Sequence, residues 1–371
     1  MEITAPAATA VSTSAPKGLV AAGFVLGGSV LSLTGLTWDI QWHSDVGPDT
    51  FFTLPHLLLY SGSAIAGIAS LVVVLLTTAA ERAGREVDPI VGGRAVGVFG
   101  RTFAAPVGYL ISGLGAASFL LYGLWDQWWH SLYGFDAVIA SPPHIGLLLS
   151  VAITMVGTVM VFATARHHRW GVIGGLVSLA VLFGFSTVIT IGLGQIPTGP
   201  VEPVPAGTAF LAALILILGA RLVDRPGGAL GVAAVLAALQ GVYWWFSPWA
   251  ARVYADAIGL PVRDYVDGIP DLPSIWPLSL LVVGGLVELL LGVARRGGDL
   301  GRMGWIAGGV AGLLVGGLAP VQTVVLRELP LPGAEVLIAT AVAGLVLGAV
   351  GGFLAVRFGG MLRQLAPVRE G

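Results

Sequence analysis

The chain has no cysteine among its 371 residues, and only 10% of its residues are charged. Without cysteine there are no disulfides, zinc–thiolate sites, iron–sulfur clusters or cysteine nucleophiles, so any metal must bind His, carboxylate, amide or Met. Soluble domains carry about 25% charged residues. With 56% hydrophobic residues and a mean hydropathy of +0.90, this chain belongs to the membrane class. It has no basic stripe that would indicate a nucleic-acid partner.

Familiar soluble-enzyme motifs are also missing. The sequence contains no phosphate-binding loop, dinucleotide fingerprint, nucleophile elbow or haem-attachment motif. What it has are apolar runs of about 20 residues, the length that a helix needs to cross a bilayer. They predict an all-α fold, a polytopic membrane bundle of about ten transmembrane helices, over residues 18–38, 51–79, 103–125, 143–165, 170–194, 205–222, 228–249, 274–294, 303–325 and 334–357.

The charges in the connecting segments alternate. Loops 39–50, 126–142 and 195–204 contain no Lys or Arg, whereas segments such as "RHHR" and "ARRGGDLGR" hold most of the arginines. The positive-inside rule then predicts a prokaryotic cytoplasmic (inner) membrane protein with both termini in the cytoplasm and the three loops that lack Lys and Arg outside. We divide the chain into a cytoplasmic tail (1–17), a five-helix region (18–194) and a further five-helix region of unknown role (195–371).

Two segments of the first region nearly repeat each other. They read "WDIQWHSDVGPDTFFTLPH", ending at His56, and "WDQWWHSLYGFDAVIASPPH", ending at His144. Each has an Asp, a His four residues later and a second His after Pro, at the junction between two apolar runs. The repeated residues are Asp39, His43 and His56 in the first copy and Asp126, His130 and His144 in the second.

This spacing predicts two metal sites. Residues i and i+4 share a helical face, and a Pro-His pair fits the first turn of the next helix, so each hairpin can gather one carboxylate and two imidazoles. Such a set suits non-haem iron, copper or zinc. Asp45, Asp49 and Asp136 are candidates to orient the imidazoles by accepting their other N–H. The alternative is that each Asp–His pair only pins its hairpin through a hydrogen bond.

At these residues the chain resembles the particulate methane monooxygenase and ammonia monooxygenase family, the copper membrane monooxygenases, in one of that family's membrane subunits. The pattern Asp–x3–His–x12–His, with Asp49-Thr50 and Phe52-Thr53 ahead of the last His, follows that family. A second family set with spacing x3 and x13 ends in Pro-x-His-x-Gly, and here it ends in "PPHIG". The resemblance covers residues 18–194 and implies copper at both sets. Asp126 stands where the family has Asn, and residues 195–371 have no counterpart.

Three functions follow as hypotheses. The first is a copper-dependent membrane monooxygenase in which Asp39, His43 and His56 are catalytic and O2 oxidises a small apolar substrate. Its partners would be the lipid bilayer and possible further subunits or copies of the chain. The second is metal transport or storage, for which Glu288 and Gln240 inside apolar runs are the hints. The third is a non-catalytic assembly subunit.

Overall fold

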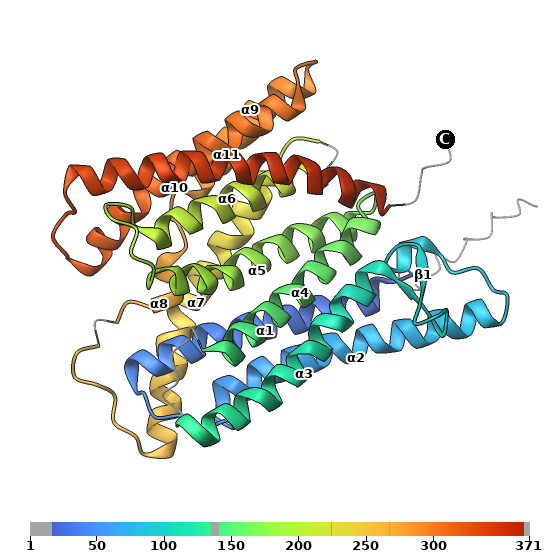
Figure 1. Cartoon of the computed structure of the whole chain (residues 1–371), viewed down its shortest axis with the longest axis horizontal. Helices are drawn as coiled ribbons and strands as arrows, with labels where there is room; N and C mark the ends of the chain where they lie inside the picture. Colours follow the sequence, from blue (N-terminus) through green and yellow to red (C-terminus); the bar gives the residue numbers. More distant parts are fainter. Residues whose placement is uncertain (1–16, 135–140, 224, 267, 367–371) are drawn as a thin grey trace, which may run out of the picture.

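The fold was analysed in a computed structural model that describes residues 17–134, 141–223, 225–266 and 268–366. These residues form eleven α-helices packed side by side as a bundle (Figure 1). The all-α prediction is confirmed. The helices are α1 (Leu19–Asp45), α2 (Leu54–Arg82), α3 (Val107–Tyr133), α4 (Pro142–Thr164), α5 (Arg169–Leu193), α6 (Pro203–Leu222), α7 (Gly228–Ile258), α8 (Asp271–Ile275), α9 (Leu280–Arg295), α10 (Leu300–Arg327) and α11 (Ala334–Gln364).

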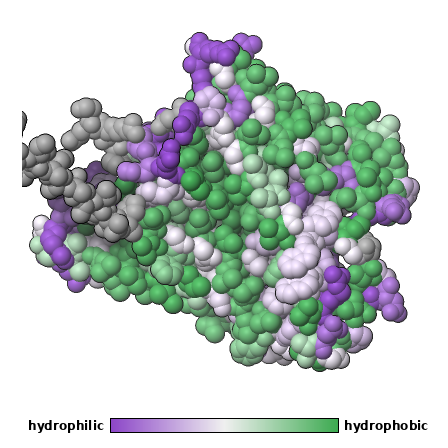
Figure 2. All heavy atoms as spheres, turned by 180° about the vertical axis from the view of Figure 1, so that it is seen from behind, coloured by the Kyte–Doolittle hydropathy of each residue, from purple (hydrophilic) through white to green (hydrophobic). Residues whose placement is uncertain are grey.

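Nine helices in the described part of the chain are long and apolar enough to cross a membrane. Figure 2 shows one face of the molecule covered mostly by hydrophobic side chains, with hydrophilic ones gathered toward its left and right ends and in a cluster at the top. This distribution fits a lipid-embedded bundle, because lipid-facing side chains must be apolar while the ends reach water. The chain is therefore a multi-pass integral membrane protein.

The expected span 274–294 differs from its prediction because it is broken. Helix α8 ends at Ile275 and α9, with 16 residues, begins only at Leu280. Trp276 has extended backbone angles (φ −67°, ψ 126°), as expected for the residue before a proline, here Pro277. The break leaves backbone carbonyls without helical partners, and such groups must be satisfied inside lipid.

Side chains of two neighbouring helices satisfy the broken segment. Gln240 of α7 donates to the carbonyls of Pro273 and Trp276, both at 2.8 Å. Gln322 of α10 donates to Ser274 O at 2.7 Å and Trp276 O at 3.0 Å, and it accepts from Leu278 N at 2.8 Å. The intramembrane glutamines thus hold the α8–α9 break in place.

A second departure lies between α2 and α3. This connection forms a short 3₁₀ turn, η1 (Pro89–Val91), and an antiparallel hairpin of β1 (Ala95–Val98) and β2 (Phe103–Pro106), with Val96 opposite Ala105. The apolar run expected from residue 103 therefore begins as a strand, and its helix starts at Val107. The hairpin lies at the end of the bundle that also holds the described ends of the chain (Figure 1).

The two predicted regions, which contain five helices (α1–α5) and six helices (α6–α11) among their described residues, share one hydrophobic core. Buried residues from both, such as Leu33, Phe185, Leu216 and Ala355, belong to a single cluster. In the second region α10 and α11 cross closely through glycines, and a Cβ on Gly308 would lie only 2.2 Å from Gly348 O. The first region packs α1 on α2 and α3 on α4. The joined ends of these two pairs lie opposite the end that holds the described chain ends (Figure 1).

Candidate metal centre

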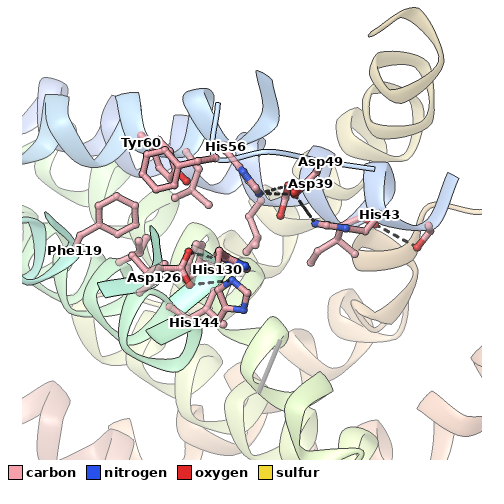
Figure 3. A pocket seen from close by; sticks show the side chains of 18 residues that line it. Asp39, His43, Asp49, His56, Tyr60, Phe119, Asp126, His130 and His144 are labelled. Carbon is pink, nitrogen blue, oxygen red and sulfur yellow. Dashed lines mark hydrogen bonds and ion pairs between the residues drawn. The ribbon is translucent and has the colours of Figure 1, made fainter. Parts of the chain in front are cut away.

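The first set forms because α1 continues in helical conformation to Asp45. Asp39 and His43 are therefore on one helical face, and His56 reaches them from the first turn of α2, directly after Pro55. His56 Nε2 lies 2.9 Å from Asp39 Oδ1, and His43 Nε2 lies 3.9 Å from the same oxygen. The predicted convergence of these three side chains is present (Figure 3).

A fourth side chain joins this set. Asp49 Oδ2 lies 3.1 Å from His43 Nε2 and 3.3 Å from His56 Nε2. One ligand atom from each of the four residues lies within 4.8 Å of all the others. Four ligands at about 2.1 Å from a shared tetrahedral ion lie about 3.4 Å apart, so the spacing fits a common ion. Asp49, predicted to orient an imidazole from behind, instead faces the same nitrogens as Asp39.

The second set forms in the same way on the other hairpin. Helix α3 continues to Tyr133 and carries Asp126 and His130, while His144 lies in the first turn of α4. Asp126 Oδ2 is 3.4 Å from His130 Nε2, and Asp126 Oδ1 is 3.3 Å from His144 Nε2. One ligand atom from each of the three residues lies within 4.8 Å of the others.

Backbone carbonyls fix the orientation of one imidazole in each set. Nδ1 of His56 lies 3.0 Å from Thr50 O, and Nδ1 of His130 lies 2.8 Å from Gly134 O. Because a carbonyl can only accept, Nδ1 carries the proton in both rings and Nε2 of the neutral ring presents a lone pair. That lone pair points at a carboxylate, an arrangement that requires a proton or a cation between them. Metal-bound histidines are held in this way by their second nitrogen.

Both sets line one cavity of about 310 Å³, toward which they point from the α1–α2 and α3–α4 hairpins (Figure 3). Sequence spacing predicts the sets at two separate spots and does not predict this meeting. Apolar side chains form the rest of the wall, with Tyr60 stacked on His56 at 6.0 Å between ring centres. The remaining lining residues are Leu36, Ile40, Ser44, Phe51, Leu59, Phe119, Leu147, Leu148, Val151 and Phe185.

The three carboxylates in this cavity face imidazoles, and no lysine or arginine among the described lining residues balances their charge. Oδ1 of Asp39 and Oδ1 of Asp126 are buried and face imidazole nitrogens, those of His56 at 2.9 Å and His144 at 3.3 Å. Since buried carboxylates are normally paired or coordinate metals, the donor set fits two cations held by the residues that the sequence singled out.

The other predicted residues have different surroundings. Asp45 is buried outside the cavity lining, and its Oδ1 accepts from Gln41 Nε2 at 2.9 Å. Asp136 lies outside the described residues. Sequence reasoning overlooked Arg263 of the α7–α8 connection, whose Nη1 donates to His43 O at 2.9 Å and Ser44 O at 3.1 Å. No motif in the sequence marks this arginine.

The two hairpins also differ in how they pack. Trp38 and Trp42 of the first copy are buried against α7, where Trp42 lies 4.8 Å from the ring centre of Tyr254. The equivalent Trp125 of the second copy is exposed on the outer face of α3. Helix α1 of the first hairpin therefore packs against α7 of the second region, whereas this part of α3 does not.

Comparisons with known proteins leave the chain without a match. No protein-family model, curated protein or solved structure matches it. The likeness to the copper membrane monooxygenases therefore depends on the motif residues alone.

Proposed function

We propose that this chain is a copper-binding membrane protein that acts as a monooxygenase-like subunit, using O2 to oxidise a small apolar substrate. The observation that carries the proposal is the single cavity in which two His–Asp sets face a wall of apolar side chains. Pockets of about 300–1,000 Å³ with apolar walls and a few convergent polar groups are typical ligand sites. A cavity of about 310 Å³ suits a small molecule.

The residues have distinct parts in this proposal. His43, His56 and Asp39 would hold one ion, and His130, His144 and Asp126 a second; bound copper would supply one-electron chemistry toward O2. Thr50 O and Gly134 O hold the rings of His56 and His130 in the orientation that binding needs. Phe119, Leu147 and Val151 give the cavity the apolar surface that would accept a hydrocarbon-like substrate from lipid.

Metal analysis of purified full-length protein tests this proposal. Protein from copper-replete cells should contain about two equivalents of copper, falling by one in a His43→Ala/His56→Ala variant and by one in His130→Ala/His144→Ala. His167→Ala/His168→Ala is the matched control, because these histidines follow α4 and do not line the cavity. Wild-type protein without copper, or copper retained by both ligand variants, would refute the proposal.

Metal analysis does not test oxygenase activity, which is measured as O2 consumption. Membranes containing the protein should consume O2 in the presence of a quinol and a small alkane or ammonia, and the two ligand variants should not. Full O2 consumption with both histidine pairs replaced would favour the assembly-subunit hypothesis instead.

The observations that suggested transport have structural explanations. Glu288 Oε1 accepts from Ala229 N at 2.7 Å, and Glu288 Oε2 pairs with Arg295 at 2.9 Å. Gln240 and Gln322 satisfy the α8–α9 break. These polar groups bind the protein's own backbone and charges, which supports a fixed site over a polar path through the membrane.

A further inference from the structure

We propose that Asp49 is a metal ligand, and that the two sets are built for ions of different charge. The first set would hold a divalent cation with four ligands, and the second would hold a singly charged soft cation such as Cu(I) in its resting form. This inference rests on the metal binding assumed in the proposed function, but not on catalysis.

The position of Asp49 carries the first step. Its side chain is only 4% exposed, and Oδ2 lies within 3.3 Å of the Nε2 atoms of both His43 and His56. A residue that orients an imidazole from behind would contact Nδ1. In His56 that position is occupied by Thr50 O. Asp49 therefore lies on the metal side of the rings.

The loop between α1 and α2 is held so that Asp49 points inward. On one side of it, Trp42 Nε1 donates to Pro48 O at 2.9 Å. On the other side, Thr50 N donates to Thr53 Oγ1 at 2.7 Å and Thr50 O accepts from His56. Because both neighbours of Asp49 are fixed, the carboxylate is preorganised toward the imidazoles and binding an ion requires little rearrangement.

Charge balance then separates the two sets. With neutral imidazoles, Asp39 and Asp49 give the first set a charge of −2, and Asp126 gives the second a charge of −1. Uncompensated charge is expensive in a low-dielectric site near a bilayer. A divalent ion neutralises the first set and a monovalent ion neutralises the second.

Ligand chemistry leads to the same assignment. Carboxylate oxygens are hard ligands that favour divalent ions, whereas imidazole binds copper well. The first set has two carboxylates for two imidazoles, and the second has one for two. The first set should therefore favour Zn²⁺ and Cu²⁺ over Cu⁺ more strongly than the second.

Redox-silent ions test this difference in full-length, metal-free protein. Zn²⁺ serves as the divalent probe and Ag⁺ as the stand-in for Cu⁺. Each set is isolated by removing the other: His130→Ala/His144→Ala leaves the first, and His43→Ala/His56→Ala leaves the second. We expect Zn²⁺ to bind the isolated first set at least about tenfold more tightly than the second, whereas Ag⁺ should bind the two sets with similar affinity.

Asp49→Asn in the first-set background is the decisive variant. It should weaken Zn²⁺ about tenfold or more and leave Ag⁺ within about twofold, since it removes one negative ligand. The matched control is Asp264→Asn, an exposed aspartate of the α7–α8 connection. Monodisperse elution in detergent checks folding of each variant.

Two results would overturn the inference. One is Zn²⁺ affinity that Asp49→Asn does not change, and the other is equal Zn²⁺-to-Ag⁺ preference in the two isolated sets. If the protein binds no metal at either set, both this inference and the proposed function are refuted. Protein that shows the Asp49-dependent preference but consumes no O2 would remove the oxygenase proposal alone.

Discussion

The first region (18–194) and the second region (195–371) use their polar side chains in different ways. In the second region, Gln240, Gln322 and Glu288 bind backbone groups or an arginine of the same region. In the first region, Asp39 and Asp126 instead face imidazoles across one cavity, with Asp39 Oδ1 2.9 Å from His56 Nε2 and Asp126 Oδ1 3.3 Å from His144 Nε2. Carboxylates and imidazoles that converge on a cavity can hold a cation between them, whereas side chains bonded to backbone groups hold the fold together.

This difference gives a rule for interpreting polar residues in or beside apolar runs. Glu288 lies inside an apolar run and Asp39 directly after one, and their surroundings give them different roles. Substitutions should therefore have opposite effects in the two regions: loss of stability without loss of metal in the second, and loss of metal without loss of stability in the first.

The largest effect on stability is expected for Gln240→Leu. The substitution removes the donor to Pro273 O and one of the two donors to Trp276 O. Each buried carbonyl left unsatisfied costs about 1–3 kcal/mol, so unfolding in detergent should occur at a clearly lower temperature. Metal bound per folded molecule should stay constant. The control is Gln195→Leu at an exposed position after α5, and metal loss in Gln240→Leu would contradict the comparison.

The converse effect is expected for the double variant Asp39→Asn/Asp126→Asn. In metal-free protein it removes two buried carboxylates from a cavity without Lys or Arg among its described lining residues. At a pH where the imidazoles are neutral, these buried charges are uncompensated and destabilising. The metal-free variant should then be more stable than metal-free wild type by about 1–2 kcal/mol, with a higher thermal midpoint.

The extra stability of the metal-free double variant should change with pH in one direction. Protonated imidazoles compensate the carboxylates at low pH, so the gain should grow as the pH rises and the rings lose their protons. Thermal scans of chelator-treated protein at several pH values measure it. A double variant less stable than wild type throughout would mean that the carboxylates hold the hairpins together, as in the structural alternative for the Asp–His pairs.

Arg263→Ala should have a smaller effect that is confined to the first set. Arg263 joins the two regions by donating to the last carbonyls of α1, those of His43 and Ser44. Gly47 (φ +104°) allows this approach, because a Cβ there would overlap the guanidinium. Without the arginine, the end of α1 loosens and His43 is less well positioned.

Zn²⁺ affinity of the isolated first set should then fall about three- to tenfold, while the second set keeps its affinity. The control is Arg252→Ala, an exposed arginine of α7. An equal loss at both sets would indicate a general loosening of the bundle and not a local effect on α1.

Features of the fold that depend on residues close together in the sequence were predictable, and features that depend on distant residues were not. Nine of the ten expected spans are confirmed, because apolar runs of about 20 residues act locally. The Asp39–His43 and Asp126–His130 pairs were also predictable, since i,i+4 spacing fixes their common face. The split of the run 274–294 has a local signal in Pro277, which the prediction overlooked, whereas the donors that satisfy the break come from α7 and α10 and leave no local signal.

The site was predictable in its members but not in its assembly. The ligand sets follow from spacing within each hairpin, whereas the shared cavity depends on how α1 and α2 pack beside α3 and α4. Asp49 lies on the opposite side of the imidazoles from the one predicted, because its direction is set by the Trp42–Pro48 contact and not by helical periodicity. Arg263 donates to the carbonyl of His43, 220 residues away in the sequence, so no local sequence pattern predicts this contact.

The smallest effect is expected for Glu288→Gln, which tests whether the second region has a transport role. The glutamine oxygen can still accept from Ala229 N, and only the partly exposed pair with Arg295 is weakened. Pairs of this kind contribute about 0–1 kcal/mol, so stability and metal content should stay near wild type. Copper accumulation by cells expressing the variant should also match wild type. A clear fall in accumulation with unchanged folding would show that Glu288 handles ions, and the contrast between a ligand-binding first region and a structural second region would then fail.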